Sequence, residues 1–75
     1  MTLDEFVDAY VTDRWESILT ICNRAAIKTY TDRFGGARSV RELSSALRDT
    51  KTRPAGVQVK WDNYAGTYLF KRERV

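Results

Sequence analysis

Few side chains in this sequence are suited to acid, base or nucleophilic chemistry. The chain has no histidine, and Cys22 is its single cysteine. Cys22 falls within an apolar stripe, where a free cysteine is ordinarily a small core residue. Carboxylates occur in pairs at Asp4/Asp8 and Asp13/Glu16, and acids of this kind are favoured in the first turns of helices by the helix dipole. We therefore expect no catalysis and no bound metal or cofactor.

Basic side chains are concentrated between residues 38 and 53, with hydroxyl side chains among them. Guanidinium, ammonium and hydroxyl groups all donate hydrogen bonds to phosphate oxygens, so this pattern is typical of contact with a nucleic-acid backbone. A solvated charged face without a ligand is the alternative. The residues predicted to contact DNA, including three on the C-terminal strands, are Arg38, Arg41, Ser45, Arg48, Lys51, Arg53, Lys60, Lys71 and Arg72.

The charge is divided along the chain. Residues 1–26 contain two basic and five acidic side chains, a net charge of −3, whereas residues 27–75 contain eleven and five, a net charge of +6. A chain divided in this way can offer a basic face to a polyanion while its acidic part meets solvent or another protein.

The N-terminal part has the pattern of a helix that would carry this acidic charge. Thr2 and Glu5 have capping-box spacing, and apolar residues then recur at three- and four-residue steps from Leu3 to Tyr30. The pattern predicts a long N-terminal helix, either continuous or broken near Thr12.

A break would be followed by a second start. Asp13 and Glu16 also have capping-box spacing, so the helix could resume there and continue toward Phe34. Gly35-Gly36 is predicted to end the helix in either case, because glycine tolerates the left-handed conformation at a helix end.

The second half predicts a short helix and then a β-hairpin. Ser39 and Glu42 have capping-box spacing ahead of an apolar face that ends near Asp49. From Val57 to Phe70 the apolar period changes from about four to two, which is typical of a hairpin. The expected fold class is α+β, in a single small domain over residues 1–75.

The segment Ile27–Leu47 resembles part of the phage Cro repressor family. The similarity lies in Ile27-Lys28-x-Tyr30-x-x-Arg33-Phe34-Gly35, followed by Arg38-Ser39-Val40-Arg41-Glu42-Leu43. In that family a helix ending in a similar Arg-Phe-Gly leads into a helix-turn-helix, a transcription-regulating DNA-binding motif.

The resemblance also implies roles for particular residues. Ser45 and Arg48 would occupy positions that contact operator bases, and the hairpin Val57–Phe70 would correspond to the C-terminal strand pair of the family. The motif's turn, between Leu43 and Ser44, is shorter here than in the family.

A second class of function fits the same charges. Small arginine-rich proteins with an acidic helix also resemble phage-type inhibitors of host systems, such as anti-CRISPR proteins, which act by protein–protein interaction. In that case Asp4 and Asp8 would mimic phosphates toward a host protein, and Tyr64 in the hairpin turn would anchor the contact.

A homodimer through the N-terminal helix is a further expectation, because heptad-like spacing would let two copies pair. The positions with this spacing are Val11, Trp15, Ile18, Cys22, Ala25 and Thr29.

The composition of the chain is that of a folded protein. The chain has 75 residues, of which 43% are hydrophobic and 12% aromatic, enough to predict a folded state. Acids at the N-terminus and the lack of a long apolar run indicate a cytoplasmic protein with no membrane partner. We therefore predict a phage- or plasmid-type regulator that binds DNA non-covalently.

Overall fold

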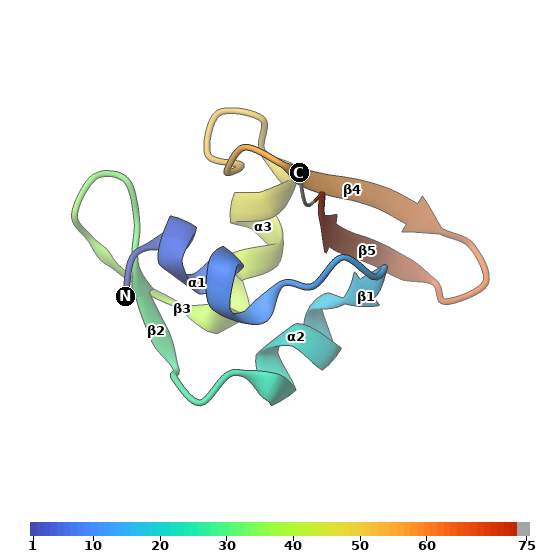
Figure 1. Ribbon diagram of the computed structural model, residues 1–75, viewed down its shortest axis with the longest axis horizontal. Helices are drawn as coiled ribbons and strands as arrows, with labels where there is room; N and C mark the ends of the chain where they lie inside the picture. Colours follow the sequence, from blue (N-terminus) through green and yellow to red (C-terminus); the bar gives the residue numbers. More distant parts are fainter. Residues whose placement is uncertain (74–75) are drawn as a thin grey trace.

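The computed structural model describes residues 1–73 and shows a small α+β protein with two antiparallel sheets, which confirms the predicted fold class (Figure 1). One sheet has the strand order β1-β5-β4, and the other is the β2–β3 hairpin. In chain order the elements are α1 (Leu3–Tyr10), β1 (Glu16–Ser17), α2 (Ile18–Arg24), β2 (Thr29–Thr31), β3 (Ala37–Ser39), a 3₁₀ turn (Val40–Glu42), α3 (Leu43–Arg48), β4 (Val57–Asp62) and β5 (Thr67–Arg72).

The first helix begins at the predicted capping box. The Thr2 hydroxyl accepts a hydrogen bond from the Glu5 backbone N–H at 3.2 Å, and the Glu5 carboxylate accepts one from the Thr2 N–H at 2.9 Å. The prediction of a long N-terminal helix is wrong, because α1 ends at Tyr10 and Val11 has extended backbone geometry. The end of α1 agrees with the alternative of a break near Thr12.

Local hydrogen bonds after Val11 explain this early end. The Thr12 hydroxyl donates to the Glu16 carboxylate at 2.8 Å and accepts from the Arg14 backbone N–H at 3.2 Å. Threonine side chains that bond to nearby groups in this way compete with helix formation. The capping box expected at Asp13 does not form. Instead α2 is capped by Ser17, whose hydroxyl accepts from the Thr20 N–H at 3.3 Å.

The helix expected to reach Phe34 is also replaced by other structure. After Arg24 the chain forms β2 and β3, and the residues between them form a turn organised by Asp32. The Asp32 carboxylate accepts from the backbone N–H groups of Phe34 and Gly36, both at 2.8 Å. Gly35 has a φ of 84° in this turn. The two glycines therefore shape a hairpin turn, and their predicted role as a helix stop is wrong.

The β2–β3 hairpin lies within the Cro-like segment, where a pair of helices was expected. Between Ile27 and Leu47 the structure has two strands, a 3₁₀ turn and one helix, so no helix pair forms there. The expected helix ending at Arg33-Phe34-Gly35 is a strand followed by a turn. The resemblance at the level of residues stays a prediction.

The predicted short helix and C-terminal hairpin are both confirmed. Ser39 and Glu42 form the second capping box, and the 3₁₀ turn leads into α3, which is followed by Asp49 as C-cap. In the hairpin, Val59 lies opposite Phe70 and continuous pairing joins β4 to β5.

The core is formed by side chains from all three helices and from the central strand of the larger sheet. Phe6 of α1, Ile21 of α2, Leu43 and Leu47 of α3, and Phe70 of β5 are each 0% exposed. This core joins elements that are far apart in the sequence.

The positions expected to pair two copies do not all lie on one helix. Val11 caps α1, Trp15 precedes β1, Ile18 and Cys22 belong to α2, Ala25 caps α2, and Thr29 begins β2. Within residues 1–73 there is thus no continuous helix to support the expected homodimer.

The two hairpins lie at opposite ends of the molecule, which measures 35 Å along its longest axis (Figure 1). The helices lie mainly between the hairpins. None of the helices among residues 1–73 has the length and apolar character needed to cross a membrane.

Candidate nucleic-acid interface

Two of the predicted DNA contacts are engaged within the fold. The Arg53 guanidinium donates to the backbone carbonyls of Leu47 at 2.7 Å and Arg48 at 3.0 Å, and so caps the C-terminal end of α3. Arg72 forms an ion pair with Asp8 of α1. A phosphate group would have to compete with these contacts, so neither arginine is a ready DNA contact.

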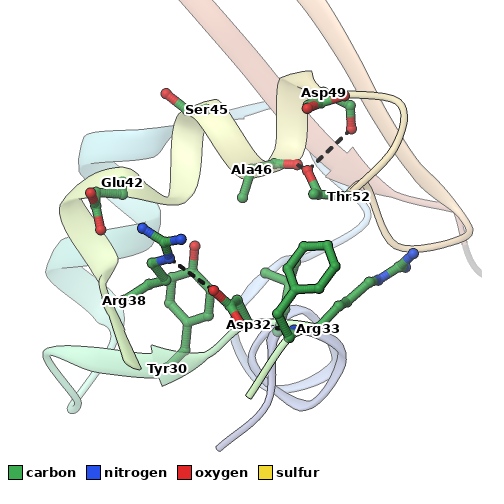
Figure 2. A pocket seen from close by; sticks show the side chains of 11 residues that line it. Tyr30, Asp32, Arg33, Arg38, Glu42, Ser45, Ala46, Asp49 and Thr52 are labelled. Atoms are coloured by element: carbon green, nitrogen blue, oxygen red, sulfur yellow. Dashed lines mark hydrogen bonds and ion pairs between the residues drawn. The ribbon is translucent and has the colours of Figure 1, made fainter. Parts of the chain in front are cut away.

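Arg38 and Ser45 line a cavity of about 260 Å³ between the β2–β3 hairpin and α3 (Figure 2). The Arg38 Nε donates to the Asp32 carboxylate at 2.8 Å. This bond, together with those from the Gly36 and Phe34 backbone N–H groups, holds the pKa of Asp32 below its ordinary value. Asp32 thus fixes both Arg38 and the turn.

The charges around this cavity do not favour a polyanion. Two guanidinium groups and three carboxylates belong to its lining, from Arg33, Arg38, Asp32, Glu42 and Asp49. With acids in excess, a phosphate group placed there would meet a negative local balance. The cavity is therefore a poor candidate for the DNA contact that Arg38 and Ser45 were predicted to make.

Arg41 and Lys51 are exposed, and neither side chain has a hydrogen bond or ion pair within residues 1–73. Arg41 lines a groove together with Leu19, Cys22 and Lys28. Lys51 lies in the loop after α3, where its backbone N–H bonds to Asp49 at 2.9 Å. The structure does not bring these two cations together.

Lys60 and Lys71, in contrast, meet around the ring of Trp15. Their Nζ atoms lie 4.6 Å and 4.9 Å from the ring centroid. The sheet register explains this arrangement, since Glu16 pairs with Phe70, which faces the core, and side chains alternate along a strand. Trp15, one residue before Glu16, therefore faces the opposite side. We call Trp15, Lys60 and Lys71 the outer-face cluster.

The contacts within the outer-face cluster leave its lysines available. A cation–π contact at an exposed site contributes about 0.5–1 kcal/mol. An exposed ammonium–phosphate pair contributes about the same, roughly 0–1 kcal/mol, so the contact with the ring does not prevent an ammonium group from turning to a phosphate. The outer-face cluster is thus a preformed group of two cations and an aromatic surface.

A second aromatic group lies on the core side of the same hairpin. The Arg48 guanidinium carbon is 4.7 Å from the centroid of the Tyr68 ring, and Trp61 packs edge-on against Tyr68 with centroids 5.1 Å apart. Trp61 is 53% exposed. We call Arg48, Trp61 and Tyr68 the inner-face cluster. In this cluster Arg48 of α3, another predicted DNA contact, packs against the hairpin.

The residues expected to contact a host protein do not form one surface. Asp8 is paired with Arg72, and Asp4 lies 4.0 Å from Arg33. Tyr64, which is 99% exposed, lies in the turn between β4 and β5, at the far end of that hairpin from α1 (Figure 1). Tyr64 is exposed as expected, but the acids belong to a different part of the molecule.

Trp15 is the functional candidate that the sequence analysis placed differently. Its spacing from Val11 and Ile18 assigned it to a helix stripe. In the structure it is half-buried on the outer face of the sheet. Its polar neighbours, from Thr12 to Ser17, were the available signal that the apolar stripe had ended.

The expected core role of Cys22 agrees with its surroundings. Burial raises the pKa of its thiol, and its Sγ donates to the Val40 carbonyl at 3.4 Å. A thiol held in this form is a poor nucleophile. Within residues 1–73, no three His, Cys, Asp or Glu side chains gather in a way that could hold a metal ion.

Protein-family models, curated proteins and solved structures all yield no match to this chain.

Proposed function

We propose that this protein binds DNA non-covalently through the β4–β5 hairpin and Trp15, as a small regulatory protein with no catalytic activity. The observation that carries the proposal is the outer-face cluster, in which Lys60 and Lys71 flank an aromatic ring. Basic groups combined with an aromatic surface are a recurring means of holding nucleic acid.

The site is narrower than the one expected from the sequence. Arg38, Arg53 and Arg72 have partners within the fold, and the two hairpins lie at opposite ends of the molecule. The proposed contact surface therefore keeps Lys60 and Lys71. Arg48 of α3 lies against the other face of the hairpin, and its guanidinium donates to the Ser44 carbonyl at 3.4 Å, so it is outside this surface. The regulatory role is part of the same proposal, because regulation is a common role of small non-catalytic DNA-binding proteins.

The test is fluorescence anisotropy of labelled DNA, both duplex and single-stranded, titrated with the protein at several salt concentrations. The protein should bind at low salt and lose affinity as salt rises. Replacing both lysines, Lys60→Ala with Lys71→Ala, should weaken binding and reduce the slope of log affinity against log salt by about 1.4 to 1.8, the value for two phosphate contacts.

The matched control removes the same charge elsewhere. Lys28→Ala with Arg41→Ala takes two cations from the groove beside α2 and leaves the hairpin unchanged. This control should bind nearly as the parent does. Equal weakening by the two double variants would show that binding depends only on net charge. If the parent protein does not bind DNA even at low salt, the proposed function is wrong.

A protein-directed inhibitor is the second candidate, and the exposure of Tyr64 favours it. Tyr64 is 99% exposed and Trp61 is 53% exposed, on the same hairpin. Aromatic side chains of this kind are typical anchors of protein interfaces. If neither form of DNA binds, the hairpin turn becomes the surface to test for a protein partner.

A further inference from the structure

We propose that the nucleic acid is single-stranded, with one base stacked on Trp15 and the neighbouring phosphates bound by Lys60 and Lys71. This inference rests on the proposed function and names the form of the ligand. It follows from the position of Trp15 and from the number of cations around it.

The position of Trp15 suits a base more than a backbone. The ring lies on the face of the sheet opposite Phe70, half-buried and flanked by two ammonium groups at 4.6 Å and 4.9 Å. A base that stacks on this ring would displace the ammonium groups toward the phosphates on either side of it. The same two lysines then bind the strand that supplies the base.

A duplex could not use this arrangement. Its bases are already stacked and paired, and an aromatic ring reaches their faces only if a base step is opened. Two lysines neutralise few phosphates, so backbone contact alone would hold a duplex weakly. In a single strand the base faces are free, and stacking adds to the electrostatic attraction.

The charges at the borders of the outer face limit the length of strand that is bound. Asp62 ends β4 beside the turn, and Glu73 follows β5, where its carboxylate accepts from Gln58 at 3.1 Å. These acids disfavour phosphates beyond the outer-face cluster. The footprint is therefore short, and two phosphate contacts give a salt slope of about −1.4 for a single strand.

The experiment uses the fact that the chain has two tryptophans. In the Trp61→Phe protein, Trp15 is the single tryptophan, so its fluorescence reports stacking directly. We expect a short oligothymidylate to quench this fluorescence and to bind more tightly than a duplex of equal length. Trp15→Ala should then lower the affinity for oligothymidylate by between about fivefold and about 150-fold, the range for loss of one stacked base.

Two further variants keep this test clear. Trp15→Phe retains an aromatic face and should keep much of the affinity, which separates loss of stacking from damage to the fold. Trp61→Ala removes the tryptophan of the inner-face cluster, on the opposite face, and should change the affinity little. Circular dichroism establishes that each variant is folded.

The possible failures are distinguishable. If duplex and single strand bind equally, and Trp15→Ala binds as Trp61→Ala does, the inference is wrong, while DNA binding through Lys60 and Lys71 stands. If oligothymidylate binds without quenching Trp15, stacking on that ring is wrong. If neither form of DNA binds, both proposals fail together.

Discussion

Individual charged residues show why the division of charge along the sequence does not become two opposed faces. Asp8 from the acidic N-terminal part pairs with Arg72 from the basic C-terminal part. Other acids find partners closer in sequence, as Glu16 does with Arg24. Fewer charges are therefore unpaired than the sequence counts suggest. Lys60 and Lys71 are among the cations that have no ion pair within residues 1–73.

Glu16 leads to a prediction about pH. Its carboxylate accepts from the Arg24 guanidinium and from Thr12, and the Arg24 contact is the main reason why the pKa of Glu16 lies below its ordinary value of 4.5. A lowered pKa in the folded state stabilises the fold above pH 4.5, and this contribution is lost as the pH falls below that value and through the folded pKa.

Glu16→Gln should remove this dependence. At neutral pH we expect a loss of about 0.5–1 kcal/mol in the free energy of unfolding, since the ion pair is in contact with solvent. Below pH 4.5 the parent should lose stability more steeply than the variant. Urea unfolding at several pH values measures both, with the exposed Asp13→Asn as control. Parallel pH curves for parent and Glu16→Gln would contradict this account.

At the scale of elements, two of the three capping boxes expected from the sequence name a helix start correctly, and the third, at Asp13/Glu16, does not form. The capping boxes Thr2/Glu5 and Ser39/Glu42 both form, and the alternation from Val57 predicts β4 and β5 correctly. Each signal is a contact between near neighbours or a pattern within one strand, so it does not depend on distant residues.

The ends of the elements depend on contacts that cannot be predicted from the spacing of apolar residues. Apolar spacing continued past Val11, yet the Thr12 hydroxyl bonds to Glu16 and the chain leaves the helix. The outer-face cluster was predictable in part, since Lys60 and Lys71 were predicted as DNA contacts because of their charge. Trp15 was not, because its place depends on pairing between β1 and β5, which are distant in sequence.

The β2–β3 hairpin gives a prediction at Gly35. Its φ of 84° is a conformation that side chains disfavour, and a Cβ there would meet nothing within 4 Å. Gly35→Ala should therefore destabilise the protein through backbone strain, by about 1 kcal/mol. Thermal unfolding by circular dichroism should show a Tm lower by about 4–8 °C.

Asparagine is the matched comparison at this position. It adopts positive φ more readily than alanine, so Gly35→Asn should recover part of the lost stability. The explanation fails if Gly35→Ala is as stable as the parent, or if the two variants lose the same stability.

At the scale of the whole molecule, a 75-residue chain has little stability to lose. Domains of this size have a free energy of unfolding of about 4–11 kcal/mol. Phe70 is 0% exposed in the central strand, and Phe70→Ala should cost about 3–5 kcal/mol. We expect this variant to be partly unfolded at 25 °C or to unfold at much lower urea concentrations.

The adjacent residue supplies the control. Leu69 is half-buried on the outer face of the same strand, so Leu69→Ala should cost no more than about 1 kcal/mol. Phe70→Leu, which leaves a smaller cavity, should lie between them. Similar losses for Leu69→Ala and Phe70→Ala would contradict the assignment of the two faces of β5.

The position of β5 between β1 and β4 also has a consequence for the order in which the protein assembles. Helices and the β4–β5 hairpin close over short loops, whereas joining Ser17 to Leu69 closes most of the chain and is slow by comparison. Trp15 reaches the two lysines only when that pairing has formed. In a partly folded chain the three residues of the outer-face cluster are therefore present but not yet close together. A ligand that binds the cluster would bind the folded protein in preference to partly folded forms.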